Sequence, residues 1–383
     1  MVLASLICFN MACTKENEPP EEDKPEIPGF VWTQTGFTEK GALTNGWMYR
    51  PRLKILDEAL YVSHHKGIFR KNLNEKNDKW ELFALGDLGL PIIDFVKNGD
   101  KILAITNTKN FQDSLVFLSV DNGKTFVNFT SPDLFKDHPF DCHIVNGGNI
   151  AYQIAQHPQD ANTVLLLHHW GVSISEDFGS SWRKILDRLP YGQNWYVGFH
   201  PLDGNTMFHS GEDMSFSGFI YRSADGGNTW SGYGTFEDYG DNCVHSIACH
   251  PANPNILVYG GEGVIGKSTD KGETWKLINL VETEMYFFKV LFDEDNPNIL
   301  YATGGGGGKS LYGEFFTLYR SADMGETWHK VFEKDTKTEW GGSIHEMIKY
   351  KNKLYLYSWG CGIVELTVTG TLRGTHFMAG ADL

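Results

Sequence analysis

The chain has 383 residues, with 33 Lys and Arg against 48 Asp and Glu, and its formal net charge is −15. This acidic balance argues against a nucleic-acid-binding surface, because the phosphate backbone would be repelled. Apolar residues make up 41% and aromatic residues 14% of the chain, which suits a packed core and not a mainly disordered protein. No apolar run reaches 18 residues, so the sequence predicts no membrane-spanning helix.

The first residues have the composition of an export signal. Small and apolar residues fill positions 1–12, Cys13 follows, and the segment 13–29 is acidic and rich in proline. This pattern resembles the signal of bacterial lipoproteins of the Bacteroidetes kind, with Cys13 as the lipidated residue. The resemblance implies an exported protein with an extended tether, held at the outer membrane by a lipid anchor, on the cell surface or in the periplasm.

Five later segments share one local pattern, Ser-x-Asp-x-Gly-x-Thr/Ser-aromatic, and we call them the turn repeats. They span 119–126, 175–182, 223–230, 268–275 and 321–328. Ser and Asp side chains can bond to turn backbone groups, Gly accepts a positive φ, and the aromatic ring begins a strand and becomes buried. The pattern therefore predicts tight hairpins with a structural role. It resembles the Asp-box, or BNR, repeats of β-propellers.

The aromatic residues that begin these strands recur at intervals of 45 to 56 residues, at Trp32, Trp80, Phe126, Trp182, Trp230, Trp275 and Trp328. Seven such strands predict an all-β, seven-bladed β-propeller that forms one domain over 30–368, followed by a tail at 369–383. The last blade has no aromatic strand after it, so we expect the Trp32 strand to complete it and close the ring. A six-bladed ring would leave the Trp32 or the Trp80 strand without a place.

In a propeller, the first strand of each blade lines the axis. The loop that leads into this strand and the loop between the second and third strands lie on the same face of the molecule. Imidazoles and carboxylates can transfer protons there, and aromatic rings can stack on sugars. We therefore expect a carbohydrate site at this axial mouth. The predicted catalytic residues are Asp94, His245, His345 and Glu346, and the predicted substrate-binding residues are Arg50, Arg52, Trp170, Trp195, Tyr196 and Trp359. The alternative is a mouth that is polar only because water fills it.

Other histidines and cysteines carry weaker signals. His157, His200 and His250 each precede a turn and are expected to have a structural role there. His138, Cys142 and His143 match no standard metal spacing with His168 or His169, so no metal or cofactor is predicted. The cysteines at 142, 243, 249 and 361 make no disulfide framework, which leaves one bridge or separate thiols.

The resemblance extends to several families with different activities. Sialidases use an arginine triad, but Tyr49-Arg50-Pro51 is one residue short of their first arginine motif. The segment 247–261 resembles xyloglucanases, photosystem-assembly propellers and sortilin, and xyloglucanases take one catalytic Asp from each of two propellers. Seven-bladed polysaccharide lyases place His, Tyr and sometimes a metal at this mouth.

We therefore expect a monomeric exported lipoprotein that acts on an oligo- or polysaccharide as a glycoside hydrolase or a lyase. A non-catalytic propeller that binds a glycan or a protein, and an assembly or scaffold factor, remain the alternatives. The fold alone does not choose among them.

Overall fold

The structure is a computed structural model, and it describes residues 27–37, 51–75, 79–85, 91–106, 115–135, 151–169, 171–187, 193–212, 217–233, 243–278, 285–305, 315–336, 344–358 and 361–372. Four predicted site residues, Cys13, Arg50, Trp170 and Trp359, lie outside these ranges. No helix in the described ranges has the length and apolar character needed to cross a bilayer.

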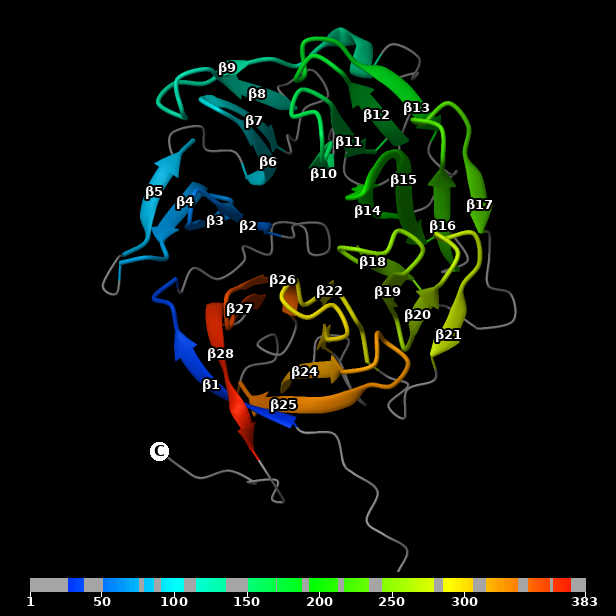
Figure 1. The fold of residues 1–383 in the computed structure, drawn as a ribbon. Helices are drawn as coiled ribbons and strands as arrows, with labels where there is room; N and C mark the ends of the chain where they lie inside the picture. Colours follow the sequence, from blue (N-terminus) through cyan, green and yellow to red (C-terminus); the bar gives the residue numbers. More distant parts are fainter. Residues whose placement is uncertain are drawn as a thin grey trace, which may run out of the picture.

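Seven antiparallel four-stranded sheets stand around a common axis (Figure 1). The first three contain β2 (Leu53–Leu56), β3 (Ala59–His64), β4 (Gly67–Asn72) and β5 (Glu81–Ala84); β6 (Ile92–Asn98), β7 (Lys101–Thr106), β8 (Val116–Ser119) and β9 (Val127–Asn128); and β10 (Ala151–Gln156), β11 (Val164–His168), β12 (Gly171–Ser175) and β13 (Arg183–Asp187). A short 3₁₀ helix, η2, spans Pro132–Phe135.

The fourth and fifth sheets contain β14 (Gln193–His200), β15 (Asp203–Glu212), β16 (Gly218–Ser223) and β17 (Ser231–Tyr233), then β18 (Val244–Cys249), β19 (Leu257–Gly261), β20 (Ile265–Ser268) and β21 (Lys276–Ile278). The sixth contains β22 (Val290–Phe292), β23 (Leu300–Gly304), β24 (Phe315–Ser321) and β25 (His329–Asp335). The seventh contains β26 (Ile344–Tyr350), β27 (Lys353–Ser358), β28 (Gly362–Leu372) and β1 (Ile27–Gln34). The protein is thus the predicted seven-bladed all-β propeller.

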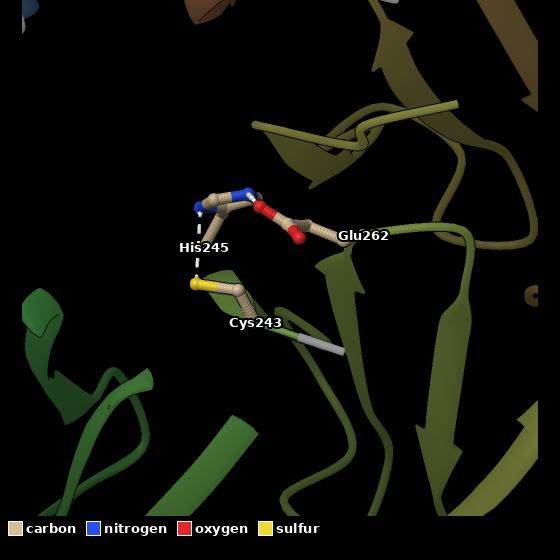
Figure 2. Close-up of side chains that lie close together, drawn as sticks. All are labelled: Cys243, His245 and Glu262. Atoms are coloured by element: carbon tan, nitrogen blue, oxygen red, sulfur yellow. Dashed lines mark hydrogen bonds and ion pairs between the residues drawn. The ribbon is translucent and has the colours of Figure 1, made fainter. Parts of the chain in front are cut away.

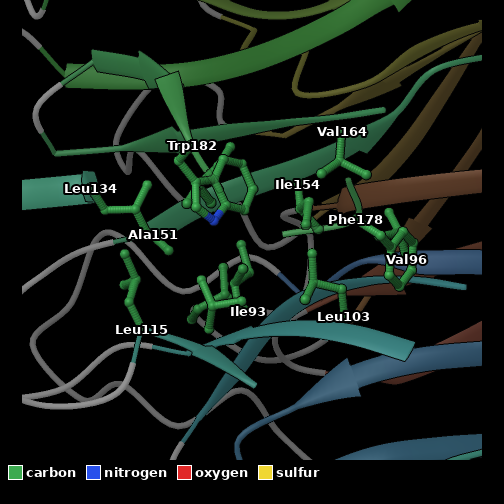
Figure 3. Close-up of a cluster of buried hydrophobic side chains, with 13 residues drawn as sticks. Ile93, Val96, Leu103, Leu115, Leu134, Ala151, Ile154, Val164, Phe178 and Trp182 are labelled. Carbon is green, nitrogen blue, oxygen red and sulfur yellow. The ribbon is translucent and has the colours of Figure 1, made fainter. Parts of the chain in front are cut away.

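The hydrophobic core lies between neighbouring blades. In Figure 3, Ile93 and Leu103 of the second blade face Ile154, Val164 and Trp182 of the third. Second strands such as β11 are buried along their whole length, because both faces of each sheet contact an adjacent sheet. This arrangement explains why the second strands are nearly continuous apolar runs and lack a polar alternation.

The ring is closed by strands from both ends of the described chain. Strand β1 pairs antiparallel with β28, with Trp32 opposite Leu366. The Trp32 ring meets Phe316 edge-on at 4.8 Å and stacks on Phe332 at 5.9 Å, which joins the seventh blade to the sixth. The predicted closure by the Trp32 strand is therefore confirmed, and both strands run a little beyond the expected limits of 30–368.

Each turn repeat is a closed network of short polar contacts. In the repeat at 223–230, the Ser223 hydroxyl donates to Asp225 at 2.9 Å and accepts from the Gly227 amide at 2.9 Å. The Thr229 hydroxyl and amide donate to the Asp225 carboxylate at 2.6 and 2.9 Å, and these contacts lower the pKa of Asp225 to about 2. Gly227 has a φ of +83°, and a Cβ there would lie 2.7 Å from Ile185. The repeats therefore have the predicted structural role.

The histidines that precede turns act as backbone acceptors. Nδ1 of His250 accepts hydrogen bonds from the amides of Ala252 and Asn253 at 3.0 and 2.9 Å. Burial lowers the pKa of His250, which favours the neutral ring that this acceptor role requires. The same contact to the backbone is made by His157, His200 and Asp293. The structural role expected for these histidines is confirmed.

Candidate functional site

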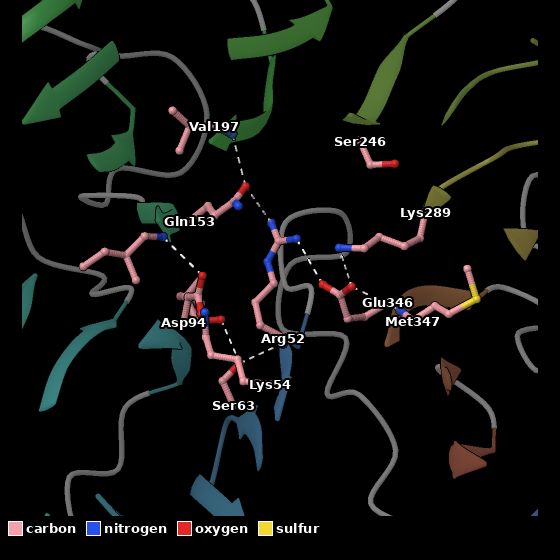
Figure 4. Close-up of polar contacts among 12 residues, drawn as sticks. Arg52, Lys54, Ser63, Asp94, Gln153, Val197, Ser246, Lys289, Glu346 and Met347 are labelled. Atoms are coloured by element: carbon pink, nitrogen blue, oxygen red, sulfur yellow. Dashed lines mark hydrogen bonds and ion pairs between the residues drawn. The ribbon is translucent and has the colours of Figure 1, made fainter. Parts of the chain in front are cut away.

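One residue from each blade occupies an equivalent place on the axis, and we call this set the axial ring: Arg52, Asp94, Gln153, Tyr196, Ser246, Lys289 and Glu346. In five blades the register of the inner strand shifts immediately before this residue. An irregularity of this kind redirects the next side chain, here toward the axis. Figure 4 shows six of the seven around the centre of the molecule.

The axial ring also joins adjacent blades through backbone contacts. A ring side chain accepts a hydrogen bond from the next blade, where the donor is the backbone amide of the residue directly after the ring residue. This contact is 3.2 Å long in three cases: Asp94 with Ile154, Gln153 with Val197, and Ser246 with Val290. Because buried amides need acceptors, these polar side chains have a structural reason to be at the axis.

Glu346 is the centre of a charge network in the ring. Its carboxylate lies 2.7 Å from Lys289 Nζ and 3.3 Å from Arg52 Nη1, and it accepts from the Met347 amide at 3.1 Å. Burial alone would raise the pKa of Glu346, but the two cations outweigh it and hold the pKa below its ordinary value. The carboxylate is therefore ionised at neutral pH.

Two further contacts extend this network across the axis. Arg52 Nη2 donates to Gln153 at 3.4 Å, so one guanidinium reaches both the seventh and the third blade (Figure 4). Asp94 is buried, lies 3.0 Å from Lys54 Nζ, and accepts from the Phe95 amide at 2.8 Å. A cavity of about 280 Å³ is lined by inner-strand residues that follow the ring residue of their own blade: Leu53, Lys54, Ile55, Leu56, Val96, Lys97, Gln156 and Ile348.

A row of aromatic side chains lies next to the axial ring, one from each of the last four blades, and we call it the aromatic arc. It consists of Trp195, His245, Phe288 and His345, each immediately before a ring residue. The ring centroids are 5.3 Å apart for Trp195 and His245, 4.9 Å for His245 and Phe288, and 4.4 Å for Phe288 and His345. The two histidines predicted to share a site thus lie in one packed row with Phe288 between them, and all four side chains of the arc are buried.

His245 also belongs to a polar cluster. Its Nδ1 lies 3.8 Å from Cys243 Sγ, and its Nε2 lies 3.6 Å from Glu262 Oε1 (Figure 2). Tyr286 is adjacent, and burial, followed by the charge of Glu262, raises the pKa of its phenol to about 12. Cys243, Cys249 and Cys361 are free thiols, so among the described cysteines the structure has the second of the two alternatives, separate thiols.

The predicted site residues within the described ranges all lie at this end of the axis. Arg52, Asp94, Tyr196 and Glu346 are in the axial ring, and Trp195, His245 and His345 are in the aromatic arc. Four residues of the axial ring and the aromatic arc were not predicted as site residues: Gln153, Ser246, Phe288 and Lys289. The alignment of the blades places each of them at the same position as a predicted residue of another blade.

Second-strand histidines that the sequence places on the same face are packed inside blades. Nε2 of His168 contacts the Ser173 hydroxyl at 2.9 Å, and Nδ1 of His209 contacts the Tyr196 carbonyl at 3.0 Å. Burial lowers the pKa of His209 to about 4, so this ring is neutral at physiological pH. These histidines support the blades and do not extend the aromatic arc.

Comparison with known proteins gives matches of several kinds. The family model described as Sortilin-Vps10 (sortilin, neurotensin receptor 3) matches residues 218–358. A xyloglucanase of Hypocrea jecorina is 26% identical over 244 residues, which cover 62% of this chain and 25% of that protein. The chain therefore spans about a quarter of the length of this curated relative.

Solved structures share the fold at low identity. The structure of YCF48 bound to D1 peptide has a TM-score of 0.59 and 14% identity, and the match covers 90% of this chain and 98% of that one. The GH74 xyloglucanase of Xanthomonas campestris has a TM-score of 0.61 and 16% identity, and the match covers 88% of this chain and 53% of that one. The protein is thus a seven-bladed β-propeller of the class to which these xyloglucanases and YCF48 proteins belong by fold.

Proposed function

We propose that the protein binds an uncharged carbohydrate at the axial mouth, with the axial ring as the floor of the site and the buried aromatic arc beside it. The observation that carries the proposal is the axial ring itself. Arg52, Gln153 and Lys289 are each partly accessible, so the floor presents several hydrogen-bonding groups close together. A few convergent polar groups beside aromatic side chains are typical of sites for oxygen-rich ligands.

The charge of the chain bears on the class of carbohydrate. A net charge of −15 repels polyanionic glycans at long range, whereas an uncharged glycan pays no such penalty. The local charges of the floor nearly cancel, because Glu346 and Asp94 face Arg52, Lys289 and Lys54. Hydroxyl groups can then be bound through hydrogen bonds without the burial of an unpaired ion.

The geometry supports binding more strongly than hydrolysis. A glycosidase needs one carboxyl group that is protonated at working pH and a second carboxylate about 5–10 Å away. Glu346 is held ionised by two cations, which makes it a poor proton donor at neutral pH. The match to the Xanthomonas campestris xyloglucanase covers about half of that chain, so the present chain corresponds to only part of that enzyme. Catalysis by Asp94, His245, His345 or Glu346 stays a prediction that the experiment below also tests.

The cellular setting is part of the same proposal. A lipid anchor at Cys13 followed by an extended tether would hold the propeller at the outer membrane, where polysaccharides are accessible. This placement depends on the sequence pattern at 1–29 alone.

A second candidate function is the binding of a peptide or protein segment at the same mouth. It is favoured by the nearly complete coverage, in both chains, of the match to YCF48 bound to D1 peptide. At 14% identity this match supports a shared fold, so the peptide ligand of that protein is only a guide to the class of partner.

The test uses a panel of uncharged oligosaccharides, including xyloglucan and mannan fragments, measured by calorimetry with the wild-type chain. Lys289→Gln removes one donor from the floor, and Lys97→Gln is the matched control, because Lys97 lines the cavity and is not a member of the axial ring. We expect saturable binding by the wild type and by Lys97→Gln, weakened at least about tenfold in Lys289→Gln, with the sugars recovered intact.

Three results would overturn this assignment. Absence of binding across the panel, together with capture of peptides from a peptide library, would favour the second candidate. Equal affinity in the two variants would place the site elsewhere. Release of shorter or unsaturated sugars would show that the protein is an enzyme.

A further inference from the structure

Three side chains with different metal-ligand chemistry meet at the wall of the axial mouth. Cys243 immediately precedes β18, His245 lies within it two residues later, and Glu262 follows β19 (Figure 2). The thiol and the imidazole lie on one face, because Cys243 Sγ is 3.8 Å from His245 Nδ1. One ligand atom from each of the three lies within 4.8 Å of the others.

The backbone holds this arrangement in place. The Glu262 amide donates to the Cys243 carbonyl at 3.0 Å, which fixes the start of one strand against the end of the next. Gly261 makes the close approach possible, because a Cβ at this position would lie 2.6 Å from the Cys243 carbonyl oxygen. The His245 ring is itself held between Trp195 and Phe288, which fixes its orientation.

We propose that Cys243, His245 and Glu262 bind a divalent transition-metal ion of the zinc class, with Nδ1 of His245 as the imidazole ligand. The inference goes beyond carbohydrate binding and does not depend on it. Tetrahedral bonds of 2.0–2.3 Å place ligand atoms about 3.3–3.7 Å apart, and the Cys243 Sγ to His245 Nδ1 distance is 3.8 Å. Glu262 is the longest of the three side chains and 28% exposed, so it can turn from Nε2 toward a metal at Nδ1.

The donor set selects the class of metal. A thiolate and an imidazole favour Zn²⁺ and its neighbours in the transition series, whereas Mg²⁺ and Ca²⁺ prefer oxygen ligands throughout. Cys243 is 0% and His245 4% exposed, so water competes little with the metal for these two ligands. Three protein ligands leave a fourth position for water or for a ligand oxygen, as in zinc sites that act on bound molecules.

The experiment uses the full chain without a histidine tag, stripped with a chelator, dialysed against Zn²⁺ and washed, with bound metal measured per chain. Co²⁺ is the second probe, because a thiolate bonded to Co²⁺ gives a strong near-ultraviolet charge-transfer band. The variants are Cys243→Ser and Glu262→Gln. The matched control is Cys249→Ser, in the same strand, which is not part of the cluster.

We expect one Zn²⁺ per chain and the cobalt–thiolate band in the wild type and in Cys249→Ser. Cys243→Ser should lose the band and bind Zn²⁺ at least about 10²-fold more weakly, and Glu262→Gln at least about tenfold more weakly. Zn²⁺ should also raise the melting temperature of the wild type and the control, but not that of Cys243→Ser.

Equal metal content in Cys243→Ser and Cys249→Ser would overturn the proposal, and so would no retained Zn²⁺ in the wild type. Melting curves in chelator separate loss of metal from loss of fold, because all variants should then melt close to the wild type. None of these measurements contains a sugar, so failure here leaves the carbohydrate proposal standing, and the reverse also holds.

Discussion

Glu346→Gln tests whether the charge network of the axial ring is structural. The substitution keeps the shape of the side chain but leaves the Lys289 ammonium and the Arg52 guanidinium without their shared counter-charge. The side chains of Glu346, Arg52 and Lys289 are only 4%, 12% and 25% exposed, so water compensates incompletely. Breaking a buried pair costs about 3–5 kcal/mol, and the partial exposure of Lys289 reduces this to roughly 3 kcal/mol.

Thermal and urea unfolding measure this cost. For a domain of this size, about 3 kcal/mol corresponds to a fall in melting temperature of roughly 4 °C. Lys289→Gln and the double variant complete a mutant cycle, in which we expect a coupling of about 1–3 kcal/mol. A Glu346→Gln variant that unfolds like the wild type would refute the structural role. If that variant also lost a sugar-cleaving activity, the residue would be catalytic.

The pH dependence gives an independent check on the same residue. The pKa of Glu346 in the folded state lies below its ordinary value of 4.5, so its contribution is complete above pH 4.5 and is lost as the pH falls through the folded-state pKa. The difference in unfolding free energy between wild type and Glu346→Gln should therefore be constant near neutral pH and shrink below pH 4.5. A difference that grows on acidification would contradict the sign of the shift.

Three further predictions concern the frame of the molecule. Deleting residues 1–36 removes β1 and the Trp32 contacts, which should expose the edge of β28 and cause aggregation; monomeric elution with unchanged melting would contradict the closure. Asp270→Ala removes the acceptor of the Thr274 amide and should cost about 1 kcal/mol in unfolding free energy while ligand affinity is kept; loss of binding in a folded variant would place the site on the wrong face. Cys13→Ser should abolish partitioning into the detergent phase when the protein is expressed in a Bacteroidetes host, and equal partitioning of both forms would rule out the anchor.

The fold could be predicted because its determinants are local. Each turn repeat contains its own hydrogen-bond acceptors and its own glycine, so eight residues specify a hairpin wherever they occur. The spacing of the aromatic residues then fixes the number of blades, and because no turn repeat follows 321–328 in the sequence, the Trp32 strand is expected to complete the ring. These features are visible in the sequence without any knowledge of distant contacts.

The contacts of the site could not be predicted in the same way. The axial ring depends on which charges meet across the channel, and Arg52 and Gln153 are 101 positions apart in the sequence. The repeat alignment placed Glu346 on the axis but gave no sign that two cations would hold it ionised. The sequence pattern also does not show that the second-strand histidines His168 and His209 are enclosed between blades. The sequence analysis did not pair Cys243 with His245, and their Glu262 partner follows the adjacent strand.

The most direct test of carbohydrate binding is a crystal structure of the protein with the oligosaccharide that binds most tightly in the panel. The account predicts an intact sugar at the axial mouth, within about 3 Å of Lys289 Nζ or Gln153, while Glu346 stays paired with Lys289 and Arg52. A sugar bound on another face, or a cleaved product with Glu346 turned toward the broken bond, would contradict it.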